Sequence, residues 1–134
     1  MANNAAFRAA FSKVISRSQG RLVEVVRSTM IEMGSSIVDR TPVRSGRARA
    51  NWCSAIGSPD YRNDIQADPS AAGARATLAK TLTDYKLGDT IYFTNSVPYA
   101  KRLEEGWSKQ APSGMVKLTI QNYATILRRV AEGL

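Results

Sequence analysis

The stretch that decides the fold is Thr90-Ile-Tyr-Phe-Thr-Asn-Ser-Val-Pro-Tyr-Ala-Lys-Arg-Leu-Glu-Glu-Gly-Trp-Ser-Lys-Gln-Ala-Pro-Ser-Gly-Met-Val-Lys-Leu-Thr119. Residues 90–94 are β-branched or aromatic, which predicts a strand. Pro98 ends this strand, because proline has no amide hydrogen for the ladder and disfavours helix at the preceding residue. Residues 99–105 then predict about two helical turns, which end at Gly106. The unit contains no histidine and no cysteine, and therefore none of the usual catalytic groupings.

On either side of the short helix at residues 99–105, the sequence predicts one further helix. A loop at residues 111–114 leads into an amphipathic helix over residues 114–132. Upstream, residues 57–73 are rich in Gly, Ser, Pro, Asp and Asn and predict a long loop, and residues 74–85 predict a helix. We interpret the whole excursion over residues 57–88 as mobile in an isolated subunit.

The N-terminal part of the chain, residues 5–39, predicts one long helix, because apolar residues recur at helical spacing. An unbroken helix of this length would measure roughly 50 Å, whereas a compact domain of this size has a radius of gyration of only about 14 Å. Two alternatives follow. The helix breaks near residues 16–20, giving two antiparallel core helices, or its first part projects from its own domain. A projecting helix with Phe7 and Phe11 on one side needs a partner.

Between these parts lies a second informative segment, Asp39-Arg-Thr-Pro-Val-Arg-Ser-Gly-Arg-Ala-Arg-Ala-Asn-Trp52. The helix is expected to end before Pro42, and residues 43–46 predict a turn. Residues 47–56 predict a strand, with Trp52 as an anchor of the core. Cys53 is expected to be a small buried hydrophobe beside it.

Composition limits the function classes. A length of 134 residues predicts a single domain, residues 1–134. With no histidine and one cysteine, the chain lacks the side chains for Ser-His-Asp or Cys-His catalysis and for nearly all zinc sites. We therefore predict no enzyme, no catalytic residue, no metal and no cofactor. No apolar run is long enough to cross a bilayer, so we expect no membrane partner.

The net charge of +8 is concentrated in particular segments. Residues 41–58 carry three basic side chains and no acid: Arg44, Arg47 and Arg49. Such a surface attracts phosphate or an acidic protein. A basic nucleic-acid-binding module is therefore an alternative function. A solvated loop or contact with an acidic neighbouring subunit is favoured over DNA contact, because the interleaved aromatic residues of single-strand binders are missing.

Two segments of the chain resemble the tail-component family of long-tailed bacteriophages, which includes neck and tail-completion proteins. One reads Asn-Ser-Val-Pro-Tyr-Ala, then Leu-Glu-Glu-Gly, then Ala-Pro-Ser-Gly-Met-Val-Lys-Leu-Thr. The other is similar to the family's Thr-Pro-Val-x-x-Gly-x-Leu-x-x-x-Trp, with Ala48 where leucine is usual. The residues that carry the resemblance are Pro42, Gly46, Trp52, Asn95, Pro98, Tyr99, Leu103, Glu104, Gly106, Pro112, Gly114 and Met115.

The resemblance implies an α+β fold in which a long N-terminal helix and a C-terminal helix pack on a small, mostly antiparallel sheet, with a long mobile loop. It implies a structural virion protein, assembled in the host cytoplasm, that forms a homo-oligomeric ring at the head–tail junction or tail-tube end. A hexamer is expected, with neck, connector and tail-tube proteins as partners and DNA as a candidate contact in the channel.

On this interpretation, Tyr99, Leu103 and Trp107 fix the corner after Pro98, and Glu104 and Glu105 meet arginines of a neighbouring subunit. A third hypothesis, a histidine-free enzyme, has only one candidate cluster: Tyr99, Arg102 and Glu105. Core packing with a salt bridge explains that cluster better.

Overall fold

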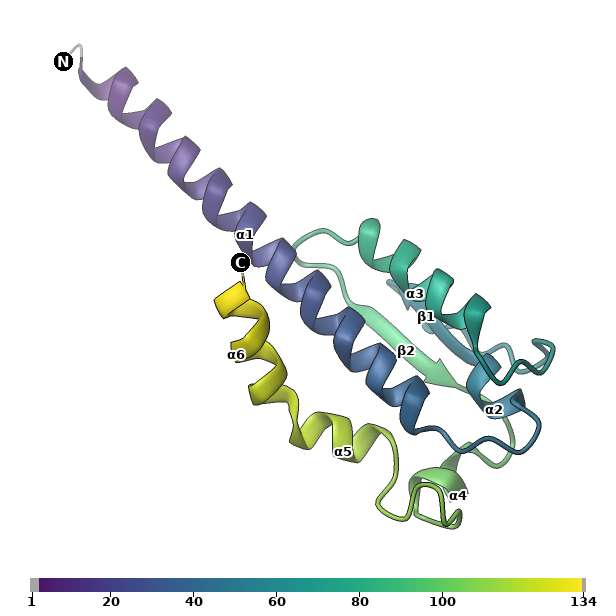
Figure 1. The fold of residues 1–134 in the computed structure, drawn as a ribbon. Coiled ribbons are helices and arrows are strands. Elements are labelled where there is room, and N and C mark those ends of the chain that lie inside the picture. The colour runs from purple at the N-terminus through teal and green to yellow at the C-terminus, as the bar shows by residue number, and fades with distance from the viewer. Residues whose placement is uncertain (1–2, 134) are drawn as a thin grey trace.

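The computed structural model describes residues 3–133, with side chains from residue 5 onward. Helices pack against a two-stranded sheet, and the α+β class predicted from the sequence is confirmed (Figure 1). The elements follow one another in the order α1 (Asn3–Arg40), α2 (Arg47–Ala50), β1 (Trp52–Ile56), α3 (Ala72–Thr83), β2 (Ile91–Asn95), α4 (Ala100–Glu104), α5 (Val116–Gln121) and α6 (Tyr123–Gly133).

The sheet is antiparallel and joins segments far apart in the sequence. Trp52 pairs with Asn95 at one end, and Ile56 pairs with Ile91 at the other. Helix α3 packs against β1, and α1 packs against α3 on one side and α5 and α6 on the other (Figure 1). The core lies where these layers meet, and its buried members are Ile37, Val38, Trp52, Ala71, Ala74, Ala111 and Met115.

Helix α1 runs unbroken through Gly20 and extends well beyond the rest of the molecule (Figure 1). The predicted break near residues 16–20 is therefore wrong, and the alternative of a projecting helix is confirmed. Glycine costs an exposed helix only about 1 kcal/mol relative to alanine. Since residues 23–40 are held by packing, this cost does not stop propagation toward the N-terminus. Every side chain from residue 5 to residue 22 is exposed.

Two other predicted elements need correction. Residues 47–50 form one helical turn, α2, and not the first half of a strand. The amide of Ala50 donates to the carbonyl of Gly46 at 3.0 Å, and the amide of Asn51 donates to that of Arg47 at 3.2 Å. The helix predicted over residues 114–132 is divided at Asn122 into α5 and α6. This division lets α5 and α6 both reach α1.

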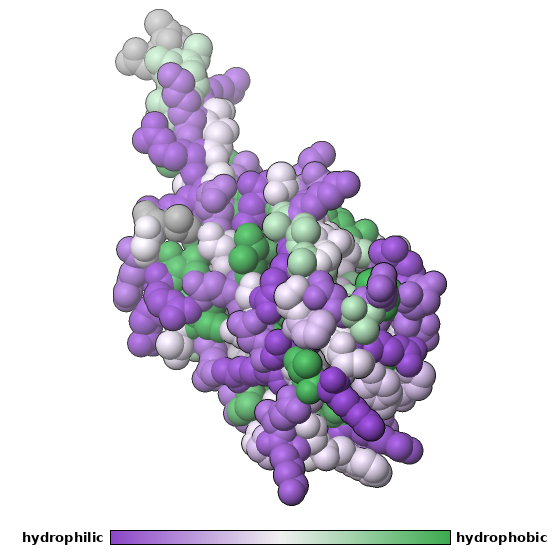
Figure 2. Space-filling model, turned by 45° about the vertical axis from the view of Figure 1, so that its right-hand side comes forward, coloured by the Kyte–Doolittle hydropathy of each residue, from purple (hydrophilic) through white to green (hydrophobic). Residues whose placement is uncertain are grey.

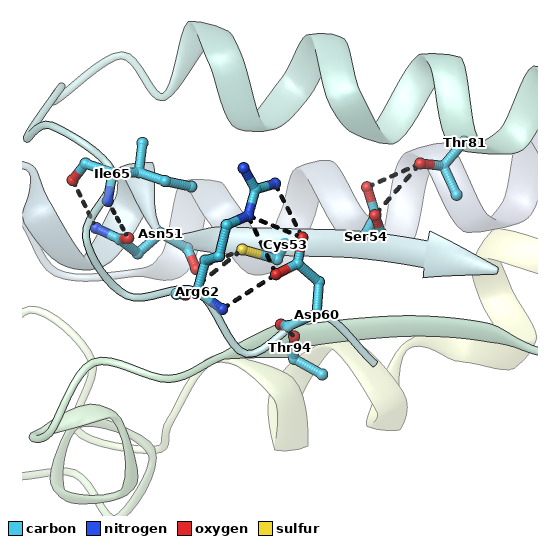
Figure 3. Close-up of polar contacts among 8 residues, drawn as sticks. All are labelled: Asn51, Cys53, Ser54, Asp60, Arg62, Ile65, Thr81 and Thr94. Carbon is cyan, nitrogen blue, oxygen red and sulfur yellow. Dashed lines mark hydrogen bonds and ion pairs between the residues drawn. The ribbon is translucent and has the colours of Figure 1, made fainter. Parts of the chain in front are cut away.

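The loop before α3 lacks helix and strand, as predicted, but side chains of both strands hold it (Figure 3). The buried amide of Asn51 donates to the Ile65 carbonyl at 3.0 Å and accepts from the Ile65 amide at 3.0 Å. The hydroxyl of Thr94 donates to the Asp60 carbonyl at 2.5 Å. The thiol of Cys53, buried as predicted, faces the Arg62 carbonyl at 3.7 Å. The mobility of this loop stays a prediction, and these contacts favour an ordered loop.

Candidate interaction site

The two informative segments of the sequence, residues 39–52 and residues 95–119, meet at one place on the surface. They line a pocket of about 530 Å³, which we call the corner pocket. Its walls come from the turn after α1 and from α4 with the loop that follows it. The lining residues are Pro42, Val43, Arg44, Ser45, Gly46, Arg47, Ala48, Tyr99, Leu103, Ser108 and Gln110. Sequence reasoning identified both segments but did not predict that they share a surface.

Side-chain amides tie the two segments together. The Gln110 amide donates to the Val43 carbonyl at 3.0 Å and accepts from the Val43 amide at 2.8 Å. At the other end, the Asn95 amide donates to the Ala48 carbonyl at 2.7 Å. These bonds satisfy backbone groups that a turn leaves without partners. Hydrogen bonds within the chain therefore fix the positions of the two pocket walls.

Glu104 caps helix α5 from a distance in the sequence. Its Oε1 accepts from the amides of Met115 at 3.0 Å and Val116 at 2.9 Å, and its Oε2 accepts from Lys117 at 2.9 Å. Burial of the carboxylate works to raise its pKa, but these three amide bonds outweigh it and lower the pKa of Glu104. Glu104 is thus bound within its own chain, and its predicted contact with an arginine of a neighbouring subunit stays a prediction.

Two glycines allow the loop between α4 and α5 to fold against itself. Gly106 has φ +87° and Gly114 has φ +84°, a region that side chains disfavour. A Cβ at Gly106 would lie 2.3 Å from the Pro112 carbonyl oxygen, and one at Gly114 would lie 2.5 Å from the Glu104 carbonyl oxygen. The pattern Glu-x-Gly followed by Pro-x-Gly-Met thus encodes a closed loop with a capped helix.

The three arginines of the basic segment have different environments. Arg49 donates to three backbone carbonyls: Thr41 at 2.9 Å, Pro69 at 3.2 Å and Asp39 at 2.8 Å. Arg47 lies over the Tyr99 ring at 5.9 Å and reaches the Asn63 carbonyl at 3.4 Å. Arg44 is exposed, and within residues 3–133 no hydrogen bond or ion pair holds it. Of the three, Arg44 is the cation available to a partner, whereas Arg49 joins three backbone segments within the chain.

This difference predicts opposite results for two arginine variants. Arg49→Ala should lower the free energy of unfolding by about 2 kcal/mol, because charge-assisted bonds to three carbonyls are lost. Arg44→Ala, its control, should change stability by no more than about 0.5 kcal/mol. Urea denaturation followed by circular dichroism measures both. Equal losses in the two variants would contradict the role of Arg49 in joining three backbone segments.

The remaining predicted site residues fall into two groups. Trp52 and Met115 are buried in the core, and Leu103 packs against it while lining the pocket. Pro98 and Pro112 are exposed on the turns on either side of α4.

Trp107 does not fix the corner, because its side chain is 69% exposed and lies against the Arg102 guanidinium at 4.9 Å. The candidate enzyme cluster is not assembled: Arg102 faces Trp107, and Glu105 pairs with Lys101 at 3.9 Å. No hydrogen bond in the described part of the chain links Tyr99 to either residue.

Within residues 3–133, neither a membrane-spanning helix nor a metal-binding cluster is found. Among residues 3–133, no helix combines the length and the apolar character that crossing a bilayer requires. The same residues contain no cluster of three or more His, Cys, Asp or Glu side chains placed to hold a metal ion. Comparison of the chain with protein-family models, curated proteins and solved structures returned no match.

Proposed function

We propose that this chain is a structural subunit of a long-tailed bacteriophage virion, which forms a ring at the head–tail junction or the end of the tail tube. A hexamer is the expected ring, and neck, connector and tail-tube proteins are the expected partners. The resemblance of two segments to the tail-component family supports the proposal. Both segments line the corner pocket, and this agrees with a shared role in assembly.

The observation that carries the proposal is the projecting part of α1, residues 5–22. Figure 2 shows this part of the helix standing clear of the globular part of the molecule. An isolated helix of this length is marginal in water, and large apolar side chains on it face solvent. A chain that folds by itself gains nothing from such an extension. A subunit that completes its fold against other chains does.

The direct test is electron microscopy of a lysate from a phage with a nonsense mutation early in this gene. We expect filled heads beside unattached or malformed tails, because a missing ring interrupts joining and not the synthesis of either part. Complementation with the intact gene is the control and should restore whole particles. Intact, infectious particles from the mutant would overturn the proposal.

Removal of residues 1–12 should separate folding from assembly. The deleted part includes exposed Phe7 and Phe11 but none of the core residues. The truncated chain should therefore melt within a few degrees of the full chain. It should fail to form rings, as judged by mass and by negative-stain images. A normal ring from the truncated chain would show that the projecting helix is dispensable.

A second candidate function, binding of nucleic acid, has one observation in its favour. Residues 5–22 carry four basic side chains and no acid: Arg8, Lys13, Arg17 and Arg21. All four are exposed. A gel shift whose affinity falls steeply with salt would support contact with phosphates. No shift even at low salt would exclude it. This candidate is compatible with the ring, since a neck ring surrounds the path of DNA.

A further inference from the structure

One face of the projecting helix carries a row of exposed apolar side chains. Phe7, Phe11, Val14 and Leu22 follow one another at helical spacing, with Ser18 between the last two, and we call this row the open stripe. Their exposed fractions are 69%, 55%, 58% and 55%. The rings of Phe7 and Phe11 stack, with centroids 6.0 Å apart and planes 10° from parallel. The apolar side chains of the stripe are therefore open to solvent, and two of them stack on each other.

The same face is covered by another helix farther along α1. Continued at the same spacing, the stripe passes through Thr29 and Glu32. Thr29 is buried, and Glu32 forms an ion pair with Arg129 of α6. Helix α6 thus lies on this face, and its described residues end beside the middle of α1 (Figure 1). The open stripe is the uncovered half of a face that already packs against a helix within the chain.

The occupant that fits the stripe best is another copy of it. Four of the eleven exposed large hydrophobic side chains of the described residues form the stripe, a fifth, Ile15, lies on the same part of the helix, and the other six are spread over the rest of the surface. The stripe exposes on the order of 500 Å² of apolar surface, and a standard interface buries about 800 Å² per partner including its polar rim. Among the described residues, no other helix carries as many exposed large hydrophobic side chains as α1.

The width of the stripe and the position of the basic residues are compatible with this choice. Of the basic residues, Arg21 borders the stripe, and Arg17 and Lys13 lie progressively farther round the helix, so all three stay in water when two stripes meet. The stripe spans an arc of about 100°, which suits a seam between helices. Ser18 within the stripe also favours a protein neighbour over lipid.

We propose that copies of this chain associate by packing the open stripes of their projecting helices against one another, with Lys13, Arg17 and Arg21 left outside the contact. The inference rests on the proposed function, because it names the surface through which subunits of the ring recognise each other. Failure of this inference can be told apart from failure of the proposed function. The test below measures self-association of the purified chain, whereas the lysate experiment measures tail joining.

The test is light scattering coupled to size exclusion on the full chain, loaded from about 10 µM to about 500 µM, because a contact of this size gives a weak affinity. The stripe variant carries Phe11→Asp and Val14→Asp. Its matched control carries Ala9→Asp and Ser16→Asp, which add the same charge to the opposite face of the same turns. All four positions are exposed, so both variants should keep the melting temperature of the wild type.

We expect the mass of the wild type and of the control to rise with concentration above that of a monomer. The stripe variant should remain monomeric, which corresponds to a dissociation constant raised by at least about 100-fold. A stripe variant that associates like the wild type would overturn the inference. A wild type that stays monomeric at the highest load would also overturn the inference. The same holds for a monomeric wild type that sediments with anionic vesicles, because its stripe would then bind lipid and not a second copy.

Chemical cross-linking then tests whether the stripes touch each other. Val14→Cys places a thiol on the stripe, and Ser16→Cys places one on the opposite face as the control. The native Cys53 is 3% exposed and should not react. A short bismaleimide should join two Val14→Cys chains and leave Ser16→Cys chains single. Equal cross-linking of the two variants would contradict stripe-to-stripe packing.

Discussion

Trp52→Ala should lower the free energy of unfolding by about 3–5 kcal/mol, the range for truncation of a buried aromatic side chain. Trp52 is 5% exposed and lies at the centre of the core. Its ring stacks on Phe93 of β2, with centroids 4.8 Å apart. Its Nε1–H donates to Thr41 Oγ1 at 2.8 Å, and that hydroxyl donates to the Ile37 carbonyl at 2.7 Å. One side chain therefore joins the end of α1 to both strands.

The second tryptophan supplies the control for this prediction. Trp107→Ala removes the same volume from an exposed site, where the contact with Arg102 contributes up to about 1 kcal/mol. Trp52→Phe keeps the stack on Phe93 and removes the hydrogen bond to Thr41, so it should cost about 1–2 kcal/mol. Urea denaturation followed by far-ultraviolet circular dichroism measures all three. A loss at Trp107 as large as the loss at Trp52 would contradict the described core.

The elements that the sequence predicted well are those whose signals are local. Period 3.6 over residues 5–39 indicated α1, and β-branched and aromatic residues at 90–94 indicated β2. The burial of Trp52 followed from its size and from the strand around it. What local signals could not decide was whether α1 broke, because a single glycine lowers helix propensity without excluding helix. The packing of residues 23–40 against the rest of the chain decides that the helix continues through Gly20.

The predictions that failed involve either a short ambiguous pattern or partners distant in the sequence. Arg47-Ala-Arg-Ala alternates in polarity, which favours a strand, but a segment of four residues fits one helical turn equally well. Arg49 was grouped with Arg44 because charge is visible in a sequence, whereas the carbonyls that Arg49 contacts are brought to it only by the fold. For Glu104 there was an indirect signal. Helix α5 lacks a side-chain cap of its own, so a distant acceptor was to be expected.

The pairing of Glu104 with the start of α5 leads to the other large effect. Glu104→Ala should lower the free energy of unfolding by about 2–3 kcal/mol, since three amides lose a charged acceptor at once. Glu104→Gln should cost about 1–2 kcal/mol, because a neutral amide offers one oxygen for three donors. The neighbouring Glu105→Ala is the control. Glu105 is exposed with only a 3.9 Å pair to Lys101, so its loss should lie within about 0.5 kcal/mol.

The effect of Glu104 should also depend on pH in a defined direction. Its pKa is lowered in the folded chain relative to the unfolded chain. Its contribution is therefore fully present above the unfolded pKa of about 4.3, and it is lost as pH falls through the lower folded value. The stability difference between wild type and Glu104→Gln should stay constant from about pH 7 to about pH 5 and shrink below about pH 4. Urea titrations at each pH measure it. A difference that stays unchanged below pH 4, or a Glu105→Ala variant that loses as much stability as Glu104→Ala, would show that α5 is not capped by this carboxylate.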